Sequence, residues 1–326
     1  MGASIMKKLF KILSLLLVLA CIIFYIKIKY DINLKLILEE DHKLLEIKKL
    51  KQKQEKLYHS CLFEEVDASL LGNNFSESEK ALTAFLSNYD AYVSYQEIDG
   101  NYYYGYKDTK PVYGASLIKL VDALYVLDNN IDINSRLKYS SSYYSKSNKG
   151  LTQYKVGDEL RIDDVVKHAL AVSDNGAHKM LIDYIGFNNL MSYGKSLGAK
   201  VILTGGDNFG MQTAEDTNVY LKRLYELTLN NESAFKFKEY MINDFHSYLN
   251  VNDLKVAHKY GYYDYLFHDI GIVYDIHPYT LSVLTMYGKK DYGKLINKIS
   301  EKVNEHHNIY WKEKEIYCKN LVYAKK

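Results

Sequence analysis

The chain has 326 residues, of which 48% are hydrophobic and 25% charged, and its formal net charge at pH 7 is +2. This length and composition are typical of one large globular domain with appendages, or of two small domains. The nearly balanced charge gives no electrostatic case for a nucleic-acid partner.

The first 30 residues have the pattern of a membrane anchor. Three lysines precede an uncharged apolar run over residues 12–26, and two more follow it closely. The run is long enough to span a bilayer when the flanking lysines extend toward the interface. A secretory signal peptide has the same basic start, but no small-x-small cleavage site follows the run. We therefore expect an uncleaved single-pass anchor over residues 1–30 in the cell membrane, with a short cytoplasmic N-terminus and the rest of the chain extracellular.

The next segment has the pattern of a helical stalk. Residues 31–59 are rich in Lys, Glu and Leu and contain neither Gly nor Pro. Apolar residues recur there at helical spacing, and a short coiled-coil dimer is an open alternative to a single helix. Residues 71–74 have the composition of a linker. We assign residues 31–75 to stalk and linker, 76–304 to the main globular domain and 305–326 to a C-terminal tail.

The patterning within residues 76–304 predicts strands at both ends and helices between them. A helix over residues 76–88, with Ser76 as its N-cap and Glu79 three residues on, opens the domain. The predicted strands cover residues 92–97, 102–107, 256–260, 269–274 and 281–287. The other predicted helices cover residues 116–127, 162–172, 176–185, 217–229 and 292–303. This order predicts an α/β sandwich whose terminal helices pack on one sheet face.

Three short strings in this domain hold the residue types of a serine acyl-transfer site. They are Ser116-Leu117-Ile118-Lys119, Ser173-Asp174-Asn175 and Lys259-Tyr260-Gly261. A serine hydroxyl is a weak nucleophile that needs a neighbouring base and an oxyanion site. On a helix, Ser116 and Lys119 project from one face, so the Lys119 amine can reach the Ser116 oxygen. The Ser116 N–H at a helix start is a natural oxyanion donor.

In this order the strings resemble the Ser-x-x-Lys, Ser-Asp-Asn and Lys-Thr-Gly set of class A β-lactamases and other penicillin-recognising serine hydrolases. The resemblance covers about residues 76–304. It implies an α/β fold of the β-lactamase/transpeptidase type, with a five-stranded antiparallel sheet, helices on both faces and an all-helical subdomain. It also implies acyl transfer on β-lactams or D-alanyl cell-wall peptides, without a cofactor or a metal.

The resemblance implies a role for each matched residue. Ser116 would be the nucleophile, and Lys119 would activate it. Ser173 would relay a proton to the leaving nitrogen, while Asn175 would hold Lys119 and the substrate. Lys259 would make the Ser173 hydroxyl more acidic and attract a substrate carboxylate.

The third string would also shape the oxyanion and substrate sites. Gly261 would let substrate lie against the strand, and the Tyr262 N–H would be the second oxyanion donor. Tyr260 stands where the family has Thr or Ser, so its hydroxyl reaches further out and weakens the case for carboxylate recognition. Two nearby histidines, His258 and His268, are interpreted as polar strand residues rather than catalysts.

The sequence offers no clear base for releasing an acyl-enzyme. Residues 201–210 stand where efficient class A enzymes carry a water-activating glutamate, and they contain none. Asp207 is the sole carboxylate there, and its glycine neighbours favour a turn role. Since general-base assistance is worth about 10²–10⁴-fold, we expect acylation of Ser116 followed by slow turnover. The alternative is a non-catalytic sensor that binds peptidoglycan or β-lactams at a membrane.

The three cysteines lack the Cys-x-x-Cys spacing of a zinc site. Cys21 lies in the apolar run, where residues 18–21 faintly resemble a lipoprotein processing box and the apolar residues after it argue against lipidation. Cys61 and Cys318 flank the catalytic region. In an exported protein these two could pair, and free thiols are the open alternative.

Overall fold

The computed structural model describes residues 2–100, 102–144, 150–200, 209–242, 248–286 and 291–324. Contacts within the chain define two compact units. One consists of Cys61–Asn320, and the other of Met1–Ser60 with Leu321–Lys326. The first of these units extends beyond both ends of the predicted catalytic range 76–304.

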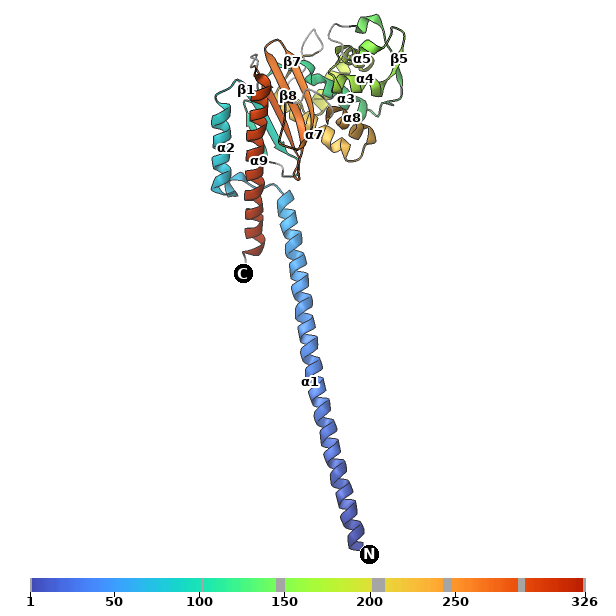
Figure 1. The fold of residues 1–326 in the computed structure, drawn as a ribbon, viewed down its shortest axis with the longest axis vertical. Helices are drawn as coiled ribbons and strands as arrows, with labels where there is room; N and C mark the ends of the chain where they lie inside the picture. Colours follow the sequence, from blue (N-terminus) through green and yellow to red (C-terminus); the bar gives the residue numbers. More distant parts are fainter. Residues whose placement is uncertain are drawn as a thin grey trace. The chain divides into compact units, whose positions relative to one another are not determined.

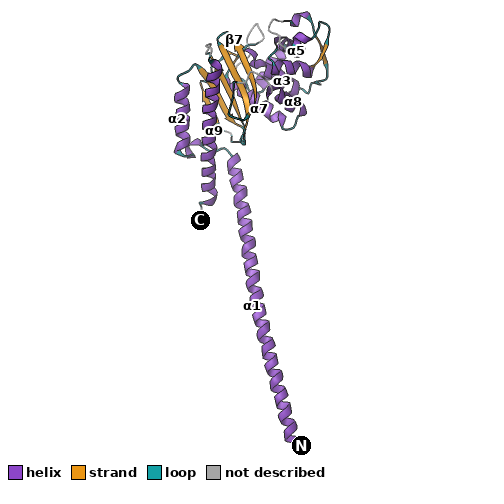
Figure 2. Cartoon of the chain, in the orientation of Figure 1, coloured by secondary structure: helices purple, strands orange, loops and turns teal. Residues whose placement is uncertain are grey.

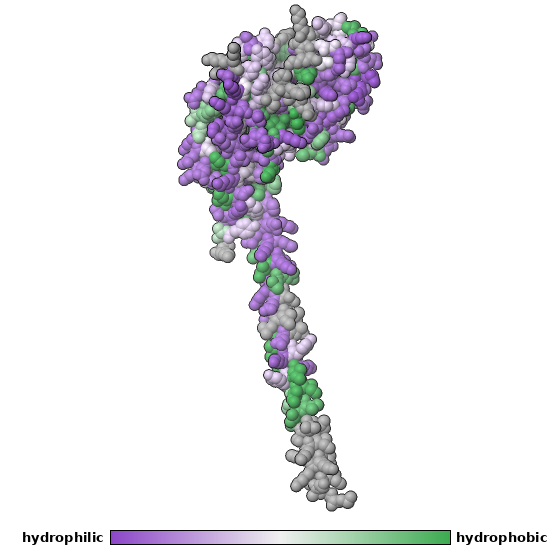
Figure 3. Space-filling view, viewed as in Figure 1, coloured by the Kyte–Doolittle hydropathy of each residue, from purple (hydrophilic) through white to green (hydrophobic). Residues whose placement is uncertain are grey.

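Helix α1 (Gly2–Phe63) runs through both the predicted anchor and the predicted stalk. No proline, and no glycine after Gly2, interrupts this stretch. Exposed apolar side chains gather on α1 between Leu17 and Ile28 (Figure 3). Among the described residues, no helix combines the length and the apolarity that crossing a membrane requires, so the expected anchor is not confirmed.

The Cys61–Asn320 unit is built on a five-stranded antiparallel sheet, which confirms the predicted fold class. The strands are β1 (Ala91–Glu97), β2 (Tyr103–Tyr106), β7 (Lys255–Tyr263), β8 (Leu266–Tyr274) and β9 (Tyr279–Thr285). Their order is β2-β1-β9-β8-β7, so the first and last parts of the unit meet where β1 pairs with β9. This order leaves β2 and β7 at the edges of the sheet.

Alternation of side chains along the strands separates two packed faces. On one face, alternate residues of β1 pack with helices α2 (Asn73–Leu86) and α9 (Tyr292–Tyr323). On the other face, helix α7 (Ala214–Thr228) lies against β1, β8 and β9. Figures 1 and 2 show α2 and α9 on one side of the sheet and α7 on the other. The sheet is therefore the middle layer between two helical layers.

A helical subdomain adjoins the α7 face. Its helices are α3 (Lys119–Asp128), α4 (Ile162–Ala171), α5 (Asn175–Ile185), α6 (Phe187–Ser196) and α8 (Glu232–Ile242). This part of the unit also contains two small two-stranded sheets. One pairs β3 (Val112–Tyr113) with β6 (Met211–Gln212), and the other pairs β4 (Arg136–Lys138) with β5 (Glu159–Arg161). Short 3-10 helices are η1 (Ala68–Leu70), η2 (Ala115–Ile118), η3 (Ser141–Tyr143) and η4 (Leu151–Gln153). Helix α3 is almost wholly buried, as expected for a helix that is apolar on most sides.

Several predicted boundaries differ from the structure. Ser76 is not an N-cap, because α2 begins at Asn73 and the Ser76 hydroxyl donates back to the Asn73 carbonyl inside the helix. The closing helix α9 does not end near residue 303, because Tyr310 and Trp311 continue its buried face and pack on Leu71 and Phe75. Helices α6 and α8 were not predicted from the sequence.

Of the two alternatives for Cys61 and Cys318, the structure shows the disulfide. The bond joins α1 to α9 with a Cα–Cα distance of 5.8 Å across a sequence separation of 257 residues. Beside it, the Lys314 ammonium donates to the Glu64 carbonyl at 2.9 Å. Together these contacts tie the beginning of the Cys61–Asn320 unit to its end.

Candidate active site

Ser116 lies in the 3-10 helix η2, which precedes α3, rather than at the start of α3 itself. The residue before it, Ala115, has a φ of 46°. Residues other than glycine rarely adopt this left-handed conformation, and such strain is typical of functional sites. The backbone therefore makes a sharp turn immediately before the Ser116 side chain.

Lys119 is the first residue of α3, and its side chain is fully buried. Its Nζ lies 2.8 Å from Ser116 Oγ, 2.6 Å from Asn175 Oδ1 and 2.7 Å from the Ser173 carbonyl oxygen. An ammonium has three hydrogens to give to the oxygens around it. A neutral amine in the same place would keep a lone pair for the Ser116 proton. Lys119 is therefore placed to act on the Ser116 oxygen in either protonation state.

The Ser173 hydroxyl lies between two lysines. Its Oγ is 3.3 Å from Lys119 Nζ and 3.1 Å from Lys259 Nζ. Ser173 also has a left-handed backbone, with a φ of 56°, and its carbonyl as well as its hydroxyl contacts Lys119. Nearby positive charge favours the ionised form of a hydroxyl, so this oxygen is suited to passing a proton.

Asp174 connects the Ser173-Asp174-Asn175 segment to the rest of the subdomain through hydrogen bonds. It is the N-cap of α5, where its Oδ1 accepts the Ala177 N–H at 3.0 Å. Its Oδ2 accepts the N–H groups of Gly150 and Leu151 at 2.9 and 3.0 Å. The carboxylate is fully buried and accepts these three backbone N–H groups, which is the geometry of a structural cap.

The third string lies on the edge strand β7, which packs against α8 and against η2, the 3-10 helix that carries Ser116. Lys259 is fully buried and donates to the Tyr260 carbonyl at 2.9 Å. A Cβ built on Gly261 would lie 2.7 Å from the Gly114 carbonyl oxygen and 3.2 Å from Leu117 Cγ. Glycine is therefore required for β7 to pack against the turn before Ser116, and the expected clearance for substrate stays a prediction.

A cavity of about 310 Å³ opens beside Ser116. It is lined by Tyr113, Ala115, Ser116, Asn175, Phe209, Tyr262 and Tyr263. Tyr260 is not in this lining, and its side chain packs in the cluster between the sheet and α9. The structure thus brings Ser116, Asn175 and Tyr262 to one cavity, with Lys119 and Lys259 buried behind it.

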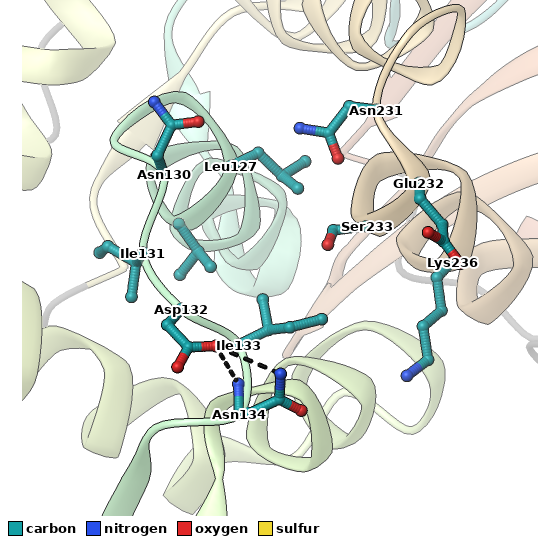
Figure 4. Close-up of a pocket in the computed structure, with 11 residues that line it drawn as sticks. Leu127, Asn130, Ile131, Asp132, Ile133, Asn134, Asn231, Glu232, Ser233 and Lys236 are labelled. Carbon is teal, nitrogen blue, oxygen red and sulfur yellow. Dashed lines mark hydrogen bonds between the residues drawn. The ribbon is translucent and has the colours of Figure 1, made fainter.

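A second cavity, of about 450 Å³, holds none of these residues. It lies between residues 126–134, after α3, and residues 231–236, at the start of α8 (Figure 4). Its Asp132 carboxylate accepts hydrogen bonds from Asn134, and its Lys236 pairs with Asp163 outside the lining. The Asp132 and Lys236 side chains are thus bound by neighbouring groups. The candidate catalytic residues lie at the Ser116 cavity instead.

His258 and His268 occupy different surroundings on β7 and β8. His258 is fully buried, and its Nδ1 lies 2.9 Å from Asp269 Oδ1, whose second oxygen accepts the backbone N–H groups of Tyr248 and Leu249. This cluster lies on the α9 face of the sheet, because His258 alternates with Lys259 along the strand. A catalytic role for His258 therefore has no support in the geometry.

His268 fixes the strand that leads to Ser116. Its Nδ1 accepts the Thr285 N–H at 3.1 Å, so the proton of the neutral ring lies on Nε2. That Nε2 donates to the Tyr113 carbonyl at 2.9 Å. Burial lowers the pKa of His268 from 6.5 to about 4. The neutral imidazole therefore links β9 and β8 to the end of β3.

Acid is expected to destabilise the fold through His268. Its pKa is about 4 in the folded chain and near 6.5 in the unfolded chain, so the unfolded chain binds the proton first as the pH falls. Stability that is fully present above pH 6.5 is lost on acidification, by about 3 kcal/mol at pH 4. Urea unfolding of the wild type and of His268→Asn across this pH range measures the effect. Equal pH dependence in the two proteins would contradict it.

A second buried pair, which the sequence analysis missed, lies one helical turn behind the lysine. Asp122 follows Lys119 by three residues, and His178 follows Asn175 by three. His178 Nδ1 lies 2.5 Å from Asp122 Oδ2, and both side chains are buried. The pair repeats the Lys119–Asn175 contact between α3 and α5, so it helps to fix their separation. The i,i+3 spacing from both motif residues was the available signal.

Phe209 joins this pair to the cavity. Its ring centroid is 4.9 Å from that of His178 and 5.6 Å from Lys119 Nζ. Phe209 lies near the end of residues 201–210, the stretch in which class A enzymes carry their water-activating glutamate. Asp207, the carboxylate of this stretch, lies outside the described residues. Of the carboxylates that follow, Glu215 pairs with Lys200, and Asp216 accepts the Lys200 N–H at 2.7 Å. Within the described part of the chain, no group of three His, Cys, Asp or Glu residues could hold a metal ion.

Comparison with known proteins gives one family and many similar folds. The model of the β-lactamase enzyme family matches residues 77–307. TLA-3, an extended-spectrum β-lactamase, is 19% identical with a TM-score of 0.64, and the match covers 71% of this chain and 98% of TLA-3. A variant of PBP-A, in an acyl-enzyme complex with penicillin G, is 16% identical with a TM-score of 0.64, covering 72% and 97%.

A third similar structure is a variant of the class A β-lactamase of the last common ancestor of Gram-negative bacteria. It is 21% identical with a TM-score of 0.62, and the match covers 73% of this chain and 99% of that one. At these identities the likeness establishes the fold, and no curated protein matches the chain.

Proposed function

The chain belongs to the β-lactamase enzyme family and is a serine hydrolase of that type, and from this premise we propose that Ser116 forms an acyl-enzyme with β-lactams or D-alanyl cell-wall peptides. The observation that carries the proposal is the short contact of 2.8 Å between Lys119 Nζ and Ser116 Oγ inside a buried hydrogen-bond set. Lys119 activates the hydroxyl, which attacks the amide carbonyl carbon.

The remaining groups act in the two steps of acylation, which are attack on the carbonyl carbon and departure of the nitrogen. The N–H groups of Ser116 and Tyr262 stabilise the oxyanion, consistent with both residues lining the cavity. When the carbon–nitrogen bond breaks, the Ser173 hydroxyl gives its proton to the leaving nitrogen and is resupplied through Lys119 or Lys259, which lie 3.3 and 3.1 Å away. The product is an ester on Ser116 and a free amine.

We propose that hydrolysis of this ester is slow. The described residues lining the cavity include no carboxylate, and the stretch 201–210 has no glutamate. Water therefore attacks the ester without the general-base assistance that is worth about 10²–10⁴-fold. The capture of a PBP-A variant as an acyl-enzyme with penicillin G supports a persistent first intermediate in this fold. The Cys61–Cys318 disulfide supports work outside the cytoplasm, where such bonds persist.

Intact-protein mass spectrometry after exposure to benzylpenicillin tests the proposal. The expected result is one adduct with the mass of the whole antibiotic, mapped to the peptide that contains Ser116, and no adduct on Ser116→Ala. An unmodified protein in the presence of intact antibiotic would contradict acylation and favour the non-catalytic sensor. An adduct that disappears as fast as it forms would leave acylation standing and contradict slow release.

A further inference from the structure

We propose that acylation at this site does not depend on a carboxylate beside the scissile amide, so that its substrates include β-lactams and peptides whose group at that position is neutral. This inference rests on the proposed function, because it concerns what the same cavity recognises. It is carried by the placement of Lys259, Tyr260 and the aromatic cavity lining.

The cation that would attract a carboxylate is enclosed by the protein. Lys259 has no exposed surface, and its Nζ donates to Ser173 Oγ at 3.1 Å and to the Tyr260 carbonyl at 2.9 Å. The Tyr260 ring lies over the same ammonium, 4.3 Å from Nζ to the ring centroid. Such a cation–π contact stabilises the charge where it is. Two of the three ammonium hydrogens are thus given to acceptors within the protein.

Tyr260 does not replace the hydroxyl that Thr or Ser would offer at its position. Its side chain is 7% exposed and belongs to the buried cluster on the α9 side of the sheet. The ring lies parallel to that of Phe267, with 6.5 Å between centroids. This packing, together with the absence of Tyr260 from the described cavity lining, places its side chain away from the space beside Ser116.

The cavity itself suits a neutral group. Its described lining has four aromatic rings and no basic side chain. The three arginines of the chain are engaged elsewhere, Arg136 with the Glu159 carbonyl, Arg161 with Asp164 and Arg223 with Asp128. An anion placed against tyrosine and phenylalanine faces without a paired cation loses hydration that nothing replaces. A neutral ester or amide has far less hydration to lose.

The test compares benzylpenicillin with its methyl ester, which differ only at the carboxylate. The second-order rate constant for adduct formation on Ser116 is measured by intact-protein mass for both compounds. For the wild type we expect the acid-to-ester ratio to lie within about threefold of one. A charge-assisted hydrogen bond to a carboxylate would favour the acid by about 10-fold or more, and a ratio of that size overturns the inference.

Two variants of Tyr260 separate the ring from the hydroxyl. Tyr260→Thr removes the ring that covers the Lys259 ammonium, so its acid-to-ester ratio is expected to rise about 10-fold above that of the wild type. Tyr260→Phe keeps the ring over Lys259, and its ratio is expected to match the wild type. A wild-type ratio in Tyr260→Thr overturns the inference. Labelling by neither compound overturns the proposed function, and the inference with it, whereas labelling by the acid alone overturns the inference only.

Discussion

Replacing Lys119 by methionine is expected to slow acylation of Ser116 by about 10²–10⁴-fold, the range that general acid–base assistance supplies. Methionine fills a similar volume but has neither a charge nor a proton to exchange with Ser116. It also leaves Asn175 Oδ1 and the Ser173 carbonyl without the donor that they contact at 2.6 and 2.7 Å. The rate constant for labelling by a fluorescent penicillin measures the effect.

Lys119→Arg is the matched control for this prediction. Arginine keeps the positive charge, but its very high pKa keeps it protonated, so it cannot take a proton near neutral pH. A rate close to wild type in Lys119→Arg would show that Lys119 acts through its charge alone, and a rate as slow as Lys119→Met would show that it acts as the base. Unchanged acylation in Lys119→Met would contradict any role in activating Ser116. Urea unfolding of each variant separates a loss of activation from a loss of fold.

Removal of the Cys61–Cys318 disulfide is expected to lower the free energy of unfolding by about 5 kcal/mol, the chain-entropy value for a loop of 257 residues. A cross-link restricts the unfolded chain, and the restriction grows with the length of the closed loop. This bond encloses nearly the whole compact unit, from its first residue to a position two residues before its end. Opening it also frees the segment that Lys314 holds through the Glu64 carbonyl.

The disulfide prediction is checked by urea unfolding of the full chain with Cys61→Ser and Cys318→Ser combined. Cys21→Ser is the matched control, because Cys21 is an exposed free cysteine and its replacement is expected to change stability little. A change within about 1 kcal/mol in the double variant would mean that native contacts rather than loop closure hold the two ends together. Reduction of the wild type should reproduce the result of the double variant.

Local patterns predicted those parts of the site whose partners are close in sequence. Ser116 and Lys119 were linked by their spacing alone, and strand alternation located most of β1, β7, β8 and β9. The Asp122–His178 pair and the His268–Tyr113 contact depend on which helices and strands become neighbours. No single segment of the sequence contains that information. That the three strings come together at one site was predicted from the family resemblance. Local spacing could not have predicted it.

One error arose from giving a local signal too much weight. Ser76 with Glu79 has the form of a capping box, yet α2 begins three residues earlier, where Asn74 reaches Glu313 on α9. The tertiary contact extends the helix past the local start signal. The place of Tyr260 in the substrate site stays a prediction, and in the structure its side chain packs in the buried cluster on the α9 side of the sheet.

The pairing of β1 with β9 has a consequence for the order in which this molecule is completed. Ala91 of β1 is paired with Thr285 of β9, so during synthesis β1 has only β2 beside it until almost the whole compact unit has been made. Contacts between such distant residues form slowly, because the loop must close before they stabilise anything. Lys259, which reaches Ser173, arrives on the same late strands. A chain truncated before these strands therefore contains Ser116 and Lys119 but lacks the sheet edge that completes their site. We expect it to gain hydrolytic activity only when the last strands have joined the sheet.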